Sequence, residues 1–100
     1  MILGRKQDAP ALPTPFDAWR LLSTDRAELV GLSLSPDEEI PSHDNEADVL
    51  FYVTAGAGTV TVDRQSERLS QGDALFIPRS ASRSWCADAS GISLLAIKLP

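Results

Sequence analysis

Short runs of alternating apolar and polar residues, separated by turn residues, recur through most of this 100-residue chain. Residues 27–35 (AELVGLSLS) alternate with a period of two, which is typical of a strand with one buried face. Further β-branched, aromatic or apolar runs occupy 18–23, 49–54, 59–63, 68–69, 74–77, 83–87 and 92–99. Turn signals recur about every 8–12 residues, which is typical of an all-β sandwich or barrel.

Polar or glycine-containing segments between these runs predict turns. Gly56 and Gly58 follow the run that begins at residue 49, residues 64–67 are polar, and residues 88–91 end in a glycine. If each of these segments reverses the chain, the sequence contains about eight or nine short strands.

The first 17 residues differ from the rest because Pro10, Pro13 and Pro15 restrict the backbone and remove hydrogen-bond donors. We expect an extended arm over residues 1–17, either disordered or laid across a neighbour. We expect one domain over residues 18–100, since a chain of this length forms a single modest core.

Charge and cysteine content exclude several classes of function. Nine basic residues against fourteen acidic ones give a net charge of −5, which disfavours a nucleic-acid partner. No apolar run approaches the ~20 residues that span a bilayer, so we expect no membrane association. Cys86 is the only cysteine, which excludes an internal disulfide and favours a cytoplasmic protein.

Acidic residues gather in one stretch, and no lysine or arginine occurs between Arg26 and Arg64. A solvated loop is one interpretation, and a hard-cation site built from carboxylate oxygens is the other. The acidic residues concerned are Asp37, Glu38, Glu39, Asp44, Glu46 and Asp48.

The stretch from residue 40 to residue 58 (IPSHDNEADVLFYVTAGAG) contains the only histidine, His43, and the only asparagine, Asn45. Polar groups of this kind, placed just before an apolar strand, mark the position where a small β-barrel holds a binding pocket. We therefore expect the pocket at this end of the predicted barrel.

The spacing of several residues resembles that of the cupin superfamily, specifically small single-domain cupins of the RmlC-like type. The first cupin motif, P-x-H-x-H-x3-E-x6-G, and the second motif, G-D-x4-P-x-G-x2-H, are matched at Pro41, His43, Gly56, Gly72, Asp73 and Pro78. The resemblance covers residues 18–99 and implies an all-β jelly-roll barrel.

The resemblance also implies a metal held by three histidines and a glutamate, and this chain departs from that set. His43 occupies the first position, whereas Asn45, Val49 and Arg83 occupy the other three, and Ser80 replaces a glycine of the second motif. One imidazole and one carboxamide bind a divalent metal weakly, and a guanidinium repels it. We therefore expect no metal cofactor.

A metal-independent pocket that binds or senses a small polar or anionic molecule is the function that we expect first. In this hypothesis His43, Asn45 and Arg83 supply polar groups, and Phe51 and Trp85 supply apolar walls. Strand alternation places further wall residues on the same face, namely Val49, Val53, Leu75 and Ile77.

Two other functions remain open. The first is a cupin enzyme of the isomerase or dioxygenase type, with a divalent transition metal in an atypical site centred on His43. The second is an interaction protein whose barrel is filled by Trp85.

We also expect a homodimer, because an exposed sheet edge must be covered, charged or paired. The candidate contact residues are Trp19, Tyr52, Ser93, Leu95 and Ile97.

Overall fold

Seven β-strands form nearly all of the regular structure, and the computed structural model describes all 100 residues. A three-residue 3-10 turn, η1 (Lys6–Asp8), precedes the strands, and no helix here has the length and apolar character to traverse a bilayer. The strands are β1 (Asp17–Ser23), β2 (Glu28–Leu34), β3 (Glu39–His43), β4 (Asp48–Val62), β5 (Gln65–Ser70), β6 (Ala74–Ile77) and β7 (Arg83–Leu99).

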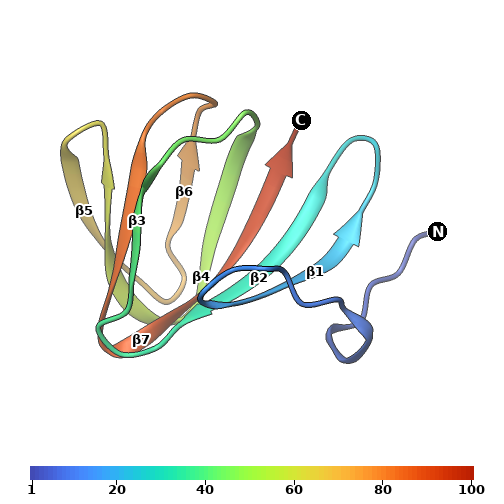
Figure 1. The fold of residues 1–100 in the computed structure, drawn as a ribbon, viewed down its shortest axis with the longest axis horizontal. Helices are drawn as coiled ribbons and strands as arrows, with labels where there is room; N and C mark the ends of the chain where they lie inside the picture. Colours follow the sequence, from blue (N-terminus) through green and yellow to red (C-terminus); the bar gives the residue numbers. More distant parts are fainter.

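The two long strands, β4 and β7, run through both halves of an antiparallel barrel (Figure 1). The first half of β4 pairs with β6 and its second half with β5. The first half of β7 pairs with β3, its second half pairs with β2, and β1 adds to β2. This topology confirms the predicted all-β jelly roll.

The glycine-containing segments in β4 and β7 are bends within long strands, so the turns predicted there are wrong. The register between the two strands shifts on both sides of Gly56. Gly56 and Gly91 have φ angles of 75° and 74°, and a Cβ on Gly56 would collide with the Gly91 carbonyl oxygen. Glycine in a strand marks a bulge or a close backbone approach as readily as a turn.

The reversal between β4 and β5 also lies earlier than predicted. Val62 pairs with Gln65, so Asp63 and Arg64 form a two-residue turn with φ angles of 47° and 72°. Positive φ at both central residues matches the right-handed twist of the paired strands. The strand that follows is longer than the run predicted at residues 68–69. The prediction was too short because most side chains of this strand are polar and exposed, so the strand shows no apolar alternation.

The two faces of the sheet that contains β6, β4, β7 and β2 differ in their surroundings. Inward residues such as Val30 and Leu94 belong to the core, whereas Leu50, Tyr52 and Phe76 are exposed on the outer face. Cross-strand pairing continues the apolar outer face from β4 to β7 through the pairs Leu50–Ile97 and Tyr52–Leu95.

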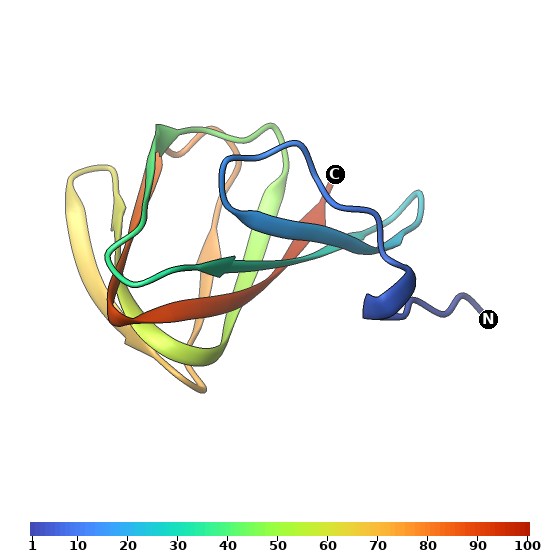
Figure 2. The same ribbon diagram turned by 60° about the horizontal axis from the view of Figure 1, so that its bottom comes forward.

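The N-terminal arm, residues 1–16, folds back along β1 of its own chain (Figure 2). The Leu12 amide donates to the Ala18 carbonyl at 2.9 Å, and the Arg20 amide donates to the Pro10 carbonyl at 3.0 Å. The arm thus contributes part of the barrel wall.

Candidate functional site

A cavity of about 260 Å³ lies inside the barrel, near the β3–β4 connection and the start of β7. All five residues predicted to form the site line this cavity: His43, Asn45, Phe51, Arg83 and Trp85. The predicted wall residue Val49 also lines it. The fold therefore brings together residues of β3, β4, β7 and the β3–β4 connection that lie up to 42 positions apart in the sequence.

Three other predicted wall residues do not line the cavity. Val53 and Ile77 have exposures of 0% and 1% and are packed in the core, and half-buried Leu75 packs against that core. The expectation for these residues is wrong because alternation predicts the side of a strand but not the depth along the barrel.

Trp85 forms a wall of the cavity and does not fill it. Its ring packs against Phe51 with a centroid distance of 5.0 Å and an interplanar angle of 58°. Tilted aromatic pairs of this kind are stable and fix both rings. The rings therefore present a fixed apolar surface to the remaining space.

Arg83 is the only charged residue in the buried set, with 1% exposure. Its Nε donates to the Ala81 carbonyl at 3.0 Å, and Nη2 donates to the Pro78 carbonyl at 3.4 Å. Arg83 takes part in none of the three salt bridges of the chain. Burial lowers the pKa of the guanidinium, and the negative charges of Asp44 and Asp63 oppose this shift.

A β-bulge directs His43 into the cavity. Ile40 pairs with Trp85 and His43 pairs with Arg83, with a shift of register between the two pairs. Residues three positions apart point to opposite faces of a regular strand, so the irregularity lets both Ile40 and His43 line the cavity. The Nδ1 atom of His43 lies 3.0 Å from the Pro41 carbonyl oxygen.

Asn45 connects the two loops beside the cavity. Its Oδ1 accepts a hydrogen bond from the Ala47 amide at 3.0 Å, and its carbonyl accepts one from the Ser80 amide at 2.9 Å. Ser80 has a φ of 69°, a conformation that glycine adopts at lower cost. Ser80 therefore has a backbone conformation that suits the glycine expected at this position of the second motif.

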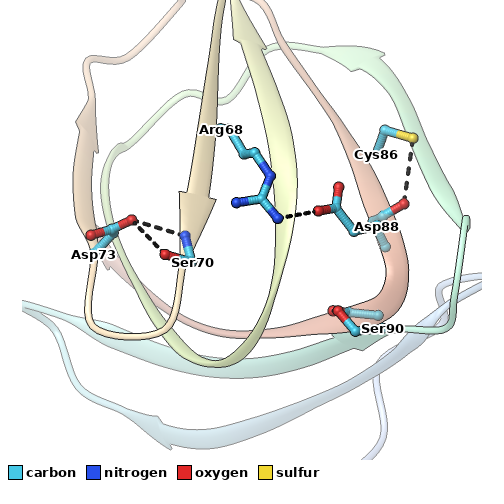
Figure 3. Close-up of polar contacts among 8 residues, drawn as sticks. Arg68, Ser70, Asp73, Cys86, Asp88 and Ser90 are labelled. Atoms are coloured by element: carbon cyan, nitrogen blue, oxygen red, sulfur yellow. Dashed lines mark hydrogen bonds and ion pairs between the residues drawn. The ribbon is translucent and has the colours of Figure 1, made fainter.

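The Gly72-Asp73 part of the second motif lies away from the cavity and has a structural role (Figure 3). Gly72 has a φ of 94°, and Oδ2 of Asp73 accepts a hydrogen bond from the Ser70 amide at 2.8 Å. These interactions close the turn between β5 and β6.

Cys86 lies on the outer face of β7, near an ion pair of 2.7 Å between Arg68 and Asp88 (Figure 3). Desolvation, and then the Glu39 carboxylate, raise the pKa of its thiol. A raised pKa keeps the exposed thiol protonated, which disfavours Cys86 as a nucleophile.

Sequence reasoning missed nine of the fifteen lining residues: four that are described next, and five apolar strand residues, namely Ala18, Val30, Leu32, Ile40 and Ala96. Lys98 lies on the inward side of β7, two positions after the buried Ala96. The alternation of the last strand therefore indicates that Lys98 points inward. Leu12, Thr14 and Phe16 line the cavity from the arm, and no local pattern predicts that the arm folds back there.

Comparison with known proteins agrees with this architecture. The family model described as "Cupin domain" matches residues 32–91. The chain belongs to the cupin family. No curated protein matches the chain significantly.

Several solved cupin structures superpose on almost the whole chain at low sequence identity, and they show the fold alone. KdgF from Halomonas sp. is 20% identical with a TM-score of 0.87, covering 98% of this chain and 94% of its own. An RmlC-like cupin from Shewanella frigidimarina is 18% identical with a TM-score of 0.87, covering 98% and 89%. A variant of oxalate decarboxylase from Bacillus subtilis is 18% identical with a TM-score of 0.87, covering 99% of this chain and 29% of its own.

The residues at the metal-ligand positions of this cupin do not fit a transition metal. His43 offers one imidazole, and the Asn45 side-chain oxygen already accepts a hydrogen bond from a backbone amide. Val49 has no metal-ligating atom, and Arg83 places a cation in the cavity. No three His, Cys, Asp or Glu side chains are grouped as a metal would require.

The acidic stretch does not supply the missing ligands. No Asp or Glu lines the cavity. Asp48 pairs with Arg79, whose backbone amide and guanidinium lower the pKa of the carboxyl, and Glu38 accepts a hydrogen bond from the Ser35 amide at 2.9 Å. These contacts favour the interpretation of the stretch as a solvated loop.

Proposed function

We propose that the barrel cavity of this cupin binds or senses a small polar or anionic molecule without the help of a metal. The observation that carries this proposal is Arg83, a buried cation that lines the cavity and has no carboxylate partner. Burying a charge is costly unless an opposite charge or several hydrogen bonds compensate it. An anionic ligand would complete the environment that the protein leaves incomplete.

The charge of the cavity lining supports the same proposal. The lining contains two cationic side chains, Arg83 and Lys98, and no acidic one, although the whole chain carries a net charge of −5. A cluster of cations with low-dielectric walls concentrates anions against the average field of the protein. Ten of the fifteen lining residues are hydrophobic, as is usual for small-molecule sites.

Two measurements test the proposal. Calorimetric titration against a panel of small carboxylates, phosphates and sugar acids should detect at least one ligand. Substitution of Arg83 by methionine should weaken its binding by about 30-fold or more. If no panel member binds at millimolar concentration, the proposal fails.

Elemental analysis of the purified protein tests the metal-dependent alternative. Stoichiometric Fe, Mn, Ni or Zn that is lost in His43→Ala would establish an atypical metal site and overturn the metal-independent proposal. We expect metal contents well below one equivalent, since only one good donor is present.

We further propose that the protein is a cytoplasmic homodimer. The single cysteine suits a reducing compartment. The exposed apolar residues Leu50, Tyr52 and Phe76 lie on one outer face, with exposures of 38%, 45% and 51%. Aromatic and apolar side chains without intervening charges are typical of the centre of an interface, and a second copy would cover them.

A further inference from the structure

The polar groups of the cavity define the kind of anion more narrowly, provided that the proposed binding function is correct. Two backbone carbonyls accept hydrogen bonds from Nε and Nη2 of Arg83 and fix the plane of its guanidinium. Arginine has five N–H donors, so three remain, all on the two Nη atoms. This arrangement suits one carboxylate that approaches the two Nη atoms end-on.

His43 lies beside this anion position and supplies the complementary hydrogen-bonding group. It is the direct cross-strand partner of Arg83, and both side chains line the cavity. A carbonyl oxygen can only accept, so the contact with Pro41 places the proton on Nδ1. In the neutral ring, Nε2 is then an acceptor, which suits a ligand hydroxyl close to the carboxylate.

The rest of the cavity calls for a compact apolar group. Its volume of about 260 Å³ corresponds to about nine water molecules at ~30 Å³ each, so the ligand has about ten non-hydrogen atoms. The tilted rings of Phe51 and Trp85 form one wall, and Phe16 of the arm adds a third aromatic side chain. A nucleotide is much larger than this space.

We infer that the cavity recognises a small 2-hydroxycarboxylate with a compact apolar or aromatic substituent. Arg83 binds the carboxylate, His43 Nε2 accepts a hydrogen bond from the adjacent hydroxyl, and the aromatic wall holds the substituent. Lys98 adds a second positive charge, which strengthens the binding of any carboxylate irrespective of its hydroxyl group.

Three probes that differ in one group each test this inference by calorimetric titration: the separate mandelate enantiomers, phenylacetate, which lacks the hydroxyl, and mandelamide, which lacks the charge. We expect one mandelate enantiomer to bind about threefold to tenfold more tightly than phenylacetate, the usual effect of one net hydrogen bond. Mandelamide should not bind measurably.

Variants at two positions assign the groups. His43→Phe should remove the preference for mandelate while phenylacetate still binds, and His43→Gln, which keeps an acceptor, should restore part of the preference. Lys98→Met should weaken mandelate and phenylacetate by the same factor. Circular dichroism and thermal unfolding establish that each variant is folded.

The outcomes separate the inference from the proposed function. Equal affinity for mandelate and phenylacetate, or a preference that survives His43→Phe, overturns the 2-hydroxycarboxylate inference and leaves anion binding in place. If the protein binds only inorganic phosphate or glucuronate, and this binding is lost in Arg83→Met, the 2-hydroxycarboxylate inference is also overturned while anion binding remains in place. Absence of binding by every anion tested overturns the proposed function itself.

Discussion

Replacing Arg83 with methionine should separate stability from ligand binding. The substitution keeps an unbranched apolar stem in the barrel and removes the charge, the Ala81 contact at 3.0 Å and the Pro78 contact at 3.4 Å. Hydrogen bonds to a charged group contribute about 1.5–3 kcal/mol each, and the longer contact contributes less. Burying the guanidinium without a carboxylate costs a similar amount, several kcal/mol.

These opposing contributions nearly cancel, so Arg83→Met should change the free energy of unfolding by no more than about 1 kcal/mol. For a domain of this size, that corresponds to a shift of roughly 4–8 °C in Tm. The affinity for an anionic ligand should fall by about 2–5 kcal/mol, or about 30-fold or more, because a buried charge pair is lost. Urea denaturation and calorimetric titration measure the two quantities.

Arg79→Met is the matched control, because the Arg79 side chain is 56% exposed and pairs with Asp48 outside the cavity. Loss of such a surface pair costs about 1 kcal/mol or less and should leave ligand affinity unchanged. If Arg83→Met loses more than about 3 kcal/mol of stability, Arg83 is a structural residue. If the variant binds the ligand as tightly as the parent protein, the anion is held elsewhere.

Further predictions concern the bend, one surface carboxylate and the outer face. Gly56→Ala should cost about 1–3 kcal/mol more than Gly72→Ala, because both residues have positive φ but only Gly56 is in close contact with backbone; urea denaturation measures the difference. At pH values above 3.8, the ordinary pKa of the carboxyl, Asp48→Asn should lower Tm. This difference in Tm should vanish as the pH falls through the lowered pKa of Asp48 in the folded protein. Tyr52→Glu should convert the proposed homodimer to a monomer in light scattering, since it places a charge in the apolar outer face.

Each of these predictions has a contradicting result. Equal destabilisation by the two glycine substitutions would show that φ alone, and not the close approach of the bends, determines the cost. An effect of Asp48→Asn that persists undiminished at pH 2 would exclude the carboxylate charge as its origin. A parent protein that is monomeric at micromolar concentration would rule out the dimer before any substitution is made.

Local sequence patterns were sufficient for the barrel and for six of the fifteen residues that line the cavity. The alternation in β2, β4 and β7 reports which side of each strand is buried, because successive side chains point to opposite faces. Motif spacing added the relative positions of His43, Asn45 and Arg83, which the structure brings to one cavity. Polar β5 was mostly missed because its exposed side chains carry no apolar signal.

The continuity of β4 and β7 could not be predicted from the same patterns. Gly56 reads equally well as a turn or as a bend, and the choice depends on its contact with Gly91, thirty-five positions away in the sequence. The contribution of the arm was equally hidden. Leu12 and Phe16 reach the cavity through backbone pairing with β1, which a proline-rich composition does not reveal.

The sequence by itself determined the all-β class, the position of the pocket and the absence of the usual metal ligands, since each depends on residue type and spacing. Only the tertiary structure decided that Trp85 leaves a cavity open, that Lys98 joins Arg83 in its lining, and that neither residue forms a salt bridge with a carboxylate. These properties depend on how strands distant in sequence pack together. The energetic effect of a buried charge depends on the groups that surround it in space.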